Sequence, residues 1–235
     1  MKYLIADFVT EFDPKYKVLD MLTKSFEYHG ERETDIKLNI SEKNIKKLLN
    51  RMTSESIIDY AEEFAYATAF NRAIIKYGAM LVHSSAILYR GGAYLFAARS
   101  GVGKSTHTRL WQDAFGGDVQ IINDDKPVVR IFEDKCIAYG TPFDGGSGIA
   151  NNVSAPLKAV VFLERGDSNT VRKAETPEIL TNLYFSTTKY VSKKTAELML
   201  LNFEKLINLC DFYILTCNTD ISAAYTARDA IVNNI

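Results

Sequence analysis

The feature that most limits the possible folds of this chain is a glycine-rich segment at residues 100–105, which reads Ser-Gly-Val-Gly-Lys-Ser. An apolar run comes directly before it and a helix-forming stretch follows, so the segment joins a strand to a helix. Gly101 and Gly103 let the backbone curl closely, and such a turn at a helix N-terminus presents N–H groups to phosphate oxygens. The usual pattern G-x-x-x-x-G-K-[ST] would have a further glycine where Ala98 stands. We expect a phosphate-binding loop here, in preference to a plain turn with an exposed lysine.

The side chains of this loop suit a nucleoside triphosphate. Lys104 would reach the β- and γ-phosphates as a positive charge, and the Ser105 hydroxyl would coordinate Mg²⁺. ATP and Mg²⁺ are therefore the expected ligands. The residues predicted to bind the nucleotide are Ser100, Gly101, Val102, Gly103, Lys104, Ser105 and Thr106.

The apolar runs around the loop predict an α/β fold with a mixed sheet. Residues 80–88 and 93–97 are two such runs, and the intervening Tyr-Arg-Gly-Gly predicts a hairpin. The strand that enters the loop then has an antiparallel neighbour, unlike the strands of a purely parallel nucleotide-binding sheet. Further strands are expected at 119–122, 128–132, 135–139, 157–163 and 212–217. Further helices are expected at 105–115, 177–186 and 193–209, and from residue 222 onward.

The first part of the chain predicts a small N-terminal α+β cap at residues 1–52, followed by the P-loop core at 53–235. Short strands are expected at 3–9 and 36–40, and Ser41 can cap a helix. A longer helix, which Ser56 can cap, ends at Gly78. Its apolar stripe is expected to face the core and consists of Ile57, Ala61, Phe64, Ala67, Phe70, Ile74 and Tyr77.

A pair of carboxylates, Asp124 and Asp125, follows the predicted strand 119–122. Carboxylates at such a strand end can hold Mg²⁺ and accept a proton, and strand alternation suggests that the two divide these roles. The alternative is an Asp-rich turn before Pro127. His83 lies inside an apolar run, and from its position alone it indicates a buried histidine that needs a hydrogen-bond partner.

The order of these motifs along the chain resembles a known family. His-Ser-Ser-Ala at 83–86 comes first, the loop at 100–105 next, and Asp124-Asp125 last. This order is similar to that in the catalytic domain of HPr kinase/phosphorylase and in its relative phosphoenolpyruvate carboxykinase, over about residues 78–165. The resemblance implies a mixed α/β core in which the histidine, the loop and the aspartates meet at the γ-phosphate and its metals.

The resemblance also implies roles for individual residues. The expected catalytic residues are His83, Lys104, Asp124 and Asp125. The expected metal ligands are Ser105, Asp124 and Asp125. By analogy with the family, Asp124 would accept the proton and Asp125 would hold Mg²⁺.

Two departures narrow what the family implies. The Gly-Ile-Ala-Asn-Asn segment at 148–152 resembles the Gly-Arg-Asn segment of HPr kinase but has no arginine, so recognition of that family's substrate does not carry over. The chain is also too short for the substrate-binding half of a carboxykinase. Its size suits the HPr-kinase-like proteins of peptide-modification clusters. We expect an ATP- and Mg²⁺-dependent kinase that phosphorylates a serine hydroxyl of a protein or peptide.

Two other functions stay open at this point. A small-molecule kinase would need a closed polar pocket near Asp144 and Arg130. A non-catalytic ATP-binding sensor would need no base, which the aspartates and His83 argue against. The segment 141–148 is either a mobile substrate loop, with Asp144 as an extra ligand, or a surface turn.

Composition excludes other classes of function. With 28 Lys and Arg against 29 Asp and Glu the net charge is −1, so nucleic acid is not an expected partner. Three scattered cysteines predict no disulfide framework and fit a reducing cytoplasm. No segment is apolar enough to predict a membrane span or a secretory signal. A homo-oligomer is left open.

Overall fold

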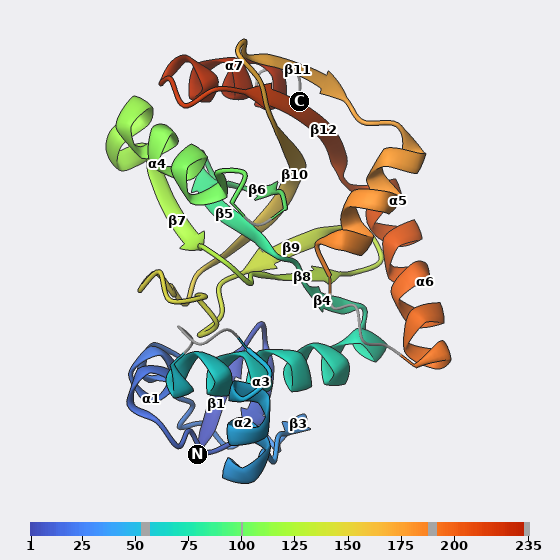
Figure 1. Cartoon of the computed structure of the whole chain (residues 1–235). Helices are drawn as coiled ribbons and strands as arrows, with labels where there is room; N and C mark the ends of the chain where they lie inside the picture. Colours follow the sequence, from blue (N-terminus) through green and yellow to red (C-terminus); the bar gives the residue numbers. More distant parts are fainter. Residues whose placement is uncertain (53–56, 100, 188–191, 233–235) are drawn as a thin grey trace.

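The computed structural model describes residues 1–52, 57–99, 101–187 and 192–232, and its elements are labelled in Figure 1. The strands are β1 (Lys2–Ile5), β2 (Phe8–Glu11), β3 (Ile36–Lys37), β4 (Ala79–Leu81), β5 (Ser84–Tyr89), β6 (Gly92–Ala97), β7 (Val119–Asn123), β8 (Val128–Ile131), β9 (Cys136–Tyr139), β10 (Ser154–Arg165), β11 (Thr170–Lys173) and β12 (Asp211–Cys217). The α-helices are α1 (Lys17–Thr23), α2 (Glu42–Leu49), α3 (Ile58–Ile74), α4 (Lys104–Phe115), α5 (Thr176–Phe185), α6 (Lys193–Leu209) and α7 (Ser222–Ile231).

The main sheet is mixed and curled, which confirms the predicted fold class at that level (Figure 1). Its strand order is β4-β8-β9-β10-β6-β5-β7, and β12 also pairs with β10 and carries β11. The long strand β10 causes the curl. Its first residues pair antiparallel with β9, while its later residues lie between β6 and β12 and run parallel to both.

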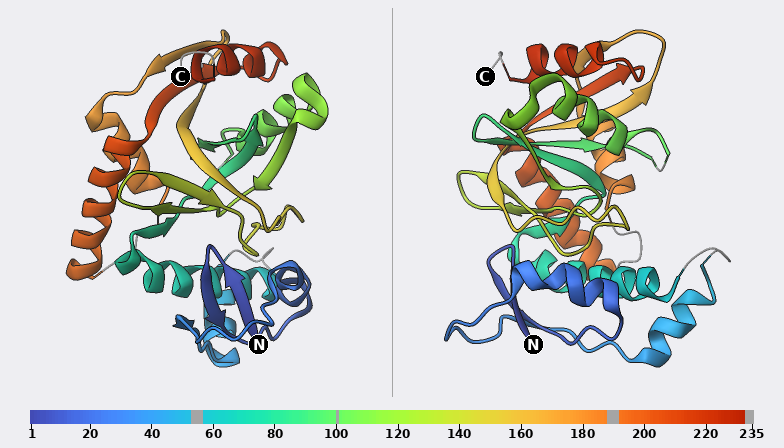
Figure 2. Two further views of the ribbon diagram at one scale, coloured as in Figure 1. Left: turned by 180° about the vertical axis from the view of Figure 1, so that it is seen from behind. Right: turned by 90° about the vertical axis from the view of Figure 1, so that its left-hand side faces the viewer.

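Helices cover both faces of this sheet, as alternation along the strands requires. Leu95 and Val160 face a core cluster with α5 and α6, whereas Phe96 and Val161 face a second cluster with α4 and α7. The two further views in Figure 2 show the helices on the two sides. Among the helices in the described ranges, none combines the length and apolar character that crossing a bilayer requires.

The predicted strand at 80–88 is wrong as a single element, because the chain changes partners within it. Residues of β4 pair with β8, whereas β5 pairs with β6 and β7. The break falls at Val82 and His83, which join the two strands. The rest of the hairpin is confirmed: Arg90 and Gly91 have φ of 48° and 78°, the positive values that a tight hairpin turn needs.

The first strand prediction, 3–9, is wrong in the same way. Ala6 and Asp7 have positive φ and turn the chain, so that β1 and β2 form an antiparallel hairpin to which β3 adds. The sequence pattern also missed α1 and β11. Ser41 caps α2 as predicted, since its side chain accepts a hydrogen bond from the Asn44 N–H. The division into a cap at 1–52 and a core at 53–235 stays a prediction.

Helix α3 lies between the N-terminal hairpin and the main sheet (Figure 1). Tyr66, Phe70 and Ile74 are buried in a cluster with side chains of β1, β2, β4 and β8. The predicted stripe is wrong at its ends, because Ile57 and Tyr77 are exposed. It is also wrong at Phe64, which lines a cavity described below. Ser56, the predicted cap, lies outside the described residues.

His107 is a core residue of α4. Its Nε2 accepts a hydrogen bond of 3.0 Å from Trp111 Nε1, its ring packs on Phe96, and its Nδ1 has no partner among the described atoms. Burial lowers the pKa of His107 to about 4, below the 6.5 expected in the unfolded chain.

This burial predicts loss of stability on acidification. The unfolded chain takes up a proton at His107 below pH 6.5 and the folded chain does so only near pH 4, so the free energy of unfolding should fall across that window. The shift corresponds to about 3 kcal/mol by pH 4. His107→Gln, which keeps an acceptor for Trp111, should lessen this fall in denaturant titrations at pH 7, 5.5 and 4. An identical pH dependence in parent and variant would contradict the assignment.

Candidate active site

Three strand ends meet at one edge of the sheet. Strands β6 and β7 run in the same direction, and β5 lies between them with opposite direction. The carboxyl ends of β6 and β7 therefore lie beside the start of β5, with Ser84 opposite Ala97 and Ala86 opposite Asn123. The residues just outside these ends are His83, the glycine-rich loop and the two aspartates. The topology thus brings together motifs that are far apart in the sequence.

Two glycines shape the described part of the glycine-rich segment, residues 101–105. Gly101 and Gly103 have φ of 78° and 123°, conformations that L side chains rarely adopt. Gly103 has no side chain to cap α4, which begins at Lys104. Arg165, the last residue of β10, donates from Nη2 to the Gly101 carbonyl and, over 3.3 Å, from Nε to the Val102 carbonyl. Arg165 is a contact that the sequence did not predict. Ser100, a predicted nucleotide ligand, lies outside the described residues.

Lys104, His83 and Asp125 form a line of contacts. The Lys104 Nζ lies 3.2 Å from the His83 Nε2, which lies 3.0 Å from an oxygen of Asp125. Both neighbours share one ring nitrogen, so Nε2 either accepts from Lys104 or donates to Asp125. Burial lowers the pKa of Lys104, although the charges of Asp125 and Asp124 oppose that effect. Lys104 is half-buried, and its ammonium group is turned toward the histidine.

Asp125 is held as a carboxylate. Burial opposes its ionisation, but the hydrogen bond from His83 and the nearby Lys126 ammonium outweigh burial and lower the pKa of Asp125 to about 2. Lys126 is in direct contact with this carboxylate. The charges of Asp125 and of Glu63 on α3 raise the pKa of Lys126 despite its burial. The acid is thus fixed in its ionised form by two basic groups.

Asp124 points away from Asp125, although both residues lie just beyond the end of β7, so strand alternation is not the cause. It is 6% exposed, and one of its oxygens accepts a hydrogen bond of 2.5 Å from the Ser85 hydroxyl. Ser85 lies 3.0 Å from the Thr108 hydroxyl, on α4. Asp124 therefore faces the first turns of α4, where Ser105 lies, while Asp125 faces His83. In the described part of the chain, no three His, Cys, Asp or Glu side chains gather as a metal site. A Mg²⁺ ion here would take most of its oxygens from phosphate and water, which is usual for this ion.

Lys126 and Glu63 are site residues that the sequence did not reveal. The Lys126 Nζ lies 3.5 Å from Glu63, which is 1% exposed and accepts a hydrogen bond of 2.9 Å from the Gly145 N–H. Asn123 orients this region, because its side-chain oxygen accepts from the N–H groups of both Asp125 and Lys126. An Asn before two acids is a signal for such a turn. Nothing in the sequence signals Glu63, which comes from a distant helix.

The segment 141–148 is not a surface turn along its whole length, and its role as a substrate loop stays a prediction. Thr141, Phe143 and Asp144 are buried, so its first half is not a surface turn. Gly145 has φ of 65° and packs against Asp125 so closely that a Cβ there would lie 2.5 Å from a carboxylate oxygen. The segment therefore forms one wall of the aspartate's surroundings.

Arg130 does not belong to this site. Its Nη1 donates to the Ala6 carbonyl over 2.9 Å, and its guanidinium lies over the Phe8 ring. These contacts of Arg130 hold the N-terminal hairpin against β8. The polar pocket near Asp144 and Arg130 that a small-molecule kinase would need stays a prediction.

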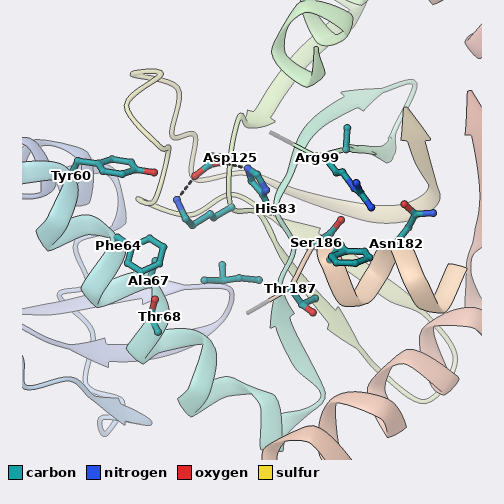
Figure 3. A pocket seen from close by; sticks show the side chains of 14 residues that line it. Tyr60, Phe64, Ala67, Thr68, His83, Arg99, Asp125, Asn182, Ser186 and Thr187 are labelled. Atoms are coloured by element: carbon teal, nitrogen blue, oxygen red, sulfur yellow. Dashed lines mark hydrogen bonds and ion pairs between the residues drawn. The ribbon is translucent and has the colours of Figure 1, made fainter. Parts of the chain in front are cut away.

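A cavity of about 760 Å³ opens beside His83 and Asp125 (Figure 3). Tyr60, Phe64 and Thr68 of α3 form one wall, and Arg99 and the end of α5 form the other. The lining residues are Tyr60, Phe64, Ala67, Thr68, Leu81, His83, Ala98, Arg99, Asp125, Lys126, Asn182, Phe185, Ser186 and Thr187.

Comparisons with known proteins give a distant likeness in structure and none in sequence. No protein-family model matches the chain, and no curated protein matches its sequence. Among solved structures, the Hpr(Ser) kinase/phosphatase from Coxiella burnetii aligns with a TM-score of 0.39 and 10% identity, over 66% of this chain and 98% of that chain. The two folds are only distantly alike.

The described structure thus brings His83, Lys104, Asp124 and Asp125 to one edge of the sheet. Ser105 and Thr106 lie in the first turn of α4, next to Gly103. Whether the loop residues bind nucleotide, and which carboxylate holds metal, stay predictions.

Proposed function

We propose that this protein is a kinase that transfers the γ-phosphoryl group of ATP, with Mg²⁺, to a serine hydroxyl of a peptide or protein. The observation that carries the proposal is the line of contacts from Lys104 through His83 to Asp125. It joins a phosphate-binding lysine to an ionised carboxylate at the mouth of a cavity. Pure nucleotide binding does not require that carboxylate, which weighs against a sensor.

In the proposed site the loop holds the triphosphate. The N–H groups at the start of α4 and the Lys104 ammonium would meet the phosphate oxygens. The space next to Gly101 and Gly103 is open, since no described heavy atom beyond their chain neighbours lies within 3.5 Å of a Cβ built at either position. A ligand can therefore approach the backbone at these two glycines. Arg165 keeps the loop in this shape from the outside.

Asp125 would receive the acceptor proton. The acceptor oxygen bonds to the γ-phosphorus while the bond from that phosphorus to the bridging oxygen of ADP breaks, and the hydroxyl proton passes to Asp125. His83 and Lys126 hold Asp125 in its ionised form, so that it can accept the proton of the acceptor hydroxyl. We favour Asp125 over Asp124 here, the reverse of the family analogy, because Asp125 lines the cavity.

Ser105 and Asp124 would then hold Mg²⁺, and their hydroxyl and carboxylate oxygens are the ligands this ion prefers. When bound, Mg²⁺ neutralises charge on the phosphate oxygens. Ser105→Ala should weaken binding of ATP in the presence of Mg²⁺ about tenfold and leave metal-free ATP binding unchanged. Calorimetric titrations with and without Mg²⁺ measure both. Equal losses in the two titrations would remove Ser105 from the metal site.

The proposed activity is tested by incubating the protein with γ-labelled ATP, Mg²⁺ and serine-containing peptides, and by locating the label with mass spectrometry. We expect ADP formation that depends on the acceptor, with label on a serine. ADP formation without any labelled acceptor would point to an ATPase instead. Label on a small alcohol from a host extract, and on no peptide, would favour the small-molecule kinase.

A further inference from the structure

We infer that the cavity beside Asp125 is the acceptor site, and that it takes a bulky apolar side chain next to the serine that is phosphorylated. This inference rests on the proposed kinase activity and adds the class of peptide that the site selects. It follows from the composition of the cavity walls and from the side on which the cavity meets the phosphate loop.

First, helix α3 presents a second, largely apolar face to the cavity. Tyr60, Phe64 and Thr68 are four residues apart, which aligns them along one side of the helix. All three are partly buried and line the cavity, whereas Tyr66 and Phe70 are buried in the N-terminal core. Phe64 belongs to none of the core clusters of the described residues. Its ring is thus available to a ligand.

The second step is the chemistry of the opposite wall. Arg99 stacks its guanidinium over the Phe185 ring, with 5.1 Å from the central carbon to the ring centre. Asn182 and Ser186 add polar groups of the kind that pair with peptide backbone. Leu81 and Ala98 add further apolar surface to the lining of the cavity. A cavity of about 760 Å³ with such walls has room for a large side chain beyond the serine itself.

The third step is the direction of the nucleotide. In a phosphate loop the lysine reaches the β- and γ-phosphates, so the γ-phosphate lies at the Lys104 end of the triphosphate. Lys104 points to His83, and His83 and Asp125 line the cavity, whereas residues 101–106 do not. The cavity therefore meets the γ-phosphate end, opposite the end that carries the nucleoside. That position belongs to the acceptor.

The test uses the full chain and synthetic peptides with one serine each. Each peptide carries Phe, Ala or Asp at a single varied position, which is either the residue directly before the serine or the residue directly after it. The peptides are otherwise identical. We expect Phe at one position to raise kcat/KM about tenfold or more over Ala. Phe64→Ala should remove most of that preference, so that the ratio of kcat/KM between the Phe and Ala peptides falls toward one. Tyr225→Ala is the matched control, because Tyr225 is an exposed aromatic residue on α7 that does not line the cavity.

Each outcome bears on a separate claim. Equal rates with Phe and Ala peptides, or a preference for Asp, would overturn the apolar acceptor site while leaving the kinase in place. An equal loss on all peptides in Phe64→Ala would assign Phe64 to stability, which a thermal melt checks. If no peptide is labelled although ATP binds, the proposed function fails and the inference fails with it.

Discussion

Lys104→Ala is expected to weaken binding of ATP by about a hundredfold and to leave the fold intact. Charged hydrogen bonds to phosphate are among the strongest polar contacts in proteins, and Lys104 is the basic side chain at the start of α4. In the absence of nucleotide its described polar side-chain contact is with His83, which can use Asp125 instead. The folded state should therefore lose little.

Calorimetric titration with ATP, beside a thermal melt of each variant, measures this effect. Arg109→Ala is the matched control, since Arg109 is an exposed basic residue on the same helix. It should bind ATP as the parent does. Unchanged affinity in Lys104→Ala would show that the loop does not bind the triphosphate.

Asp125→Asn is expected to lower kcat by about a thousandfold or more while changing ATP affinity only a few-fold. The substitution keeps the shape of the side chain and removes the charge that His83 and Lys126 hold in place. The same change should cost stability at neutral pH, because Lys126 is left buried with Glu63 as its acidic neighbour.

The pH dependence of stability checks the charge of Asp125 in the parent. Its folded pKa of about 2 lies below the value of 3.8 for a free aspartate, so the stabilisation is present above pH 3.8 and is lost as the pH falls toward 2. Asp113→Asn, an exposed change on α4, serves as the control. If Asp125→Asn turned over like the parent, Asp125 would not be the proton acceptor. If Asp125→Asn instead lost most of its Mg²⁺-dependent ATP binding, Asp125 would be a metal ligand.

Local patterns in the sequence predicted the elements that depend on local signals. Residues close together in the chain predict helix α4 and its end at Gly116, and also the hairpin around Gly91. The continuous apolar run at 80–88 concealed a change of sheet, because periodicity records burial and not the identity of the neighbouring strand. In the same way, the apolar period of α3 could not distinguish a core side chain such as Phe70 from Phe64, which lines a cavity.

The candidate site was predictable only in part. The loop and the aspartate pair carry their own chemical signals, whereas His83 entered through the order of motifs and not through its own surroundings. Lys126 and Glu63 are brought together by the packing of α3 against the loops at the sheet edge, over a long sequence separation. No rule based on the spacing of residues in the sequence predicts such a pair.

A crystal structure of the protein with Mg²⁺ and a non-hydrolysable ATP analogue tests the proposed kinase site directly. We expect the triphosphate along residues 101–105, the γ-phosphate at the Lys104 ammonium, and the cavity between Phe64 and Phe185 free of nucleoside. A nucleoside inside that cavity would contradict the acceptor site. Phosphates bound away from Lys104 would contradict the kinase itself.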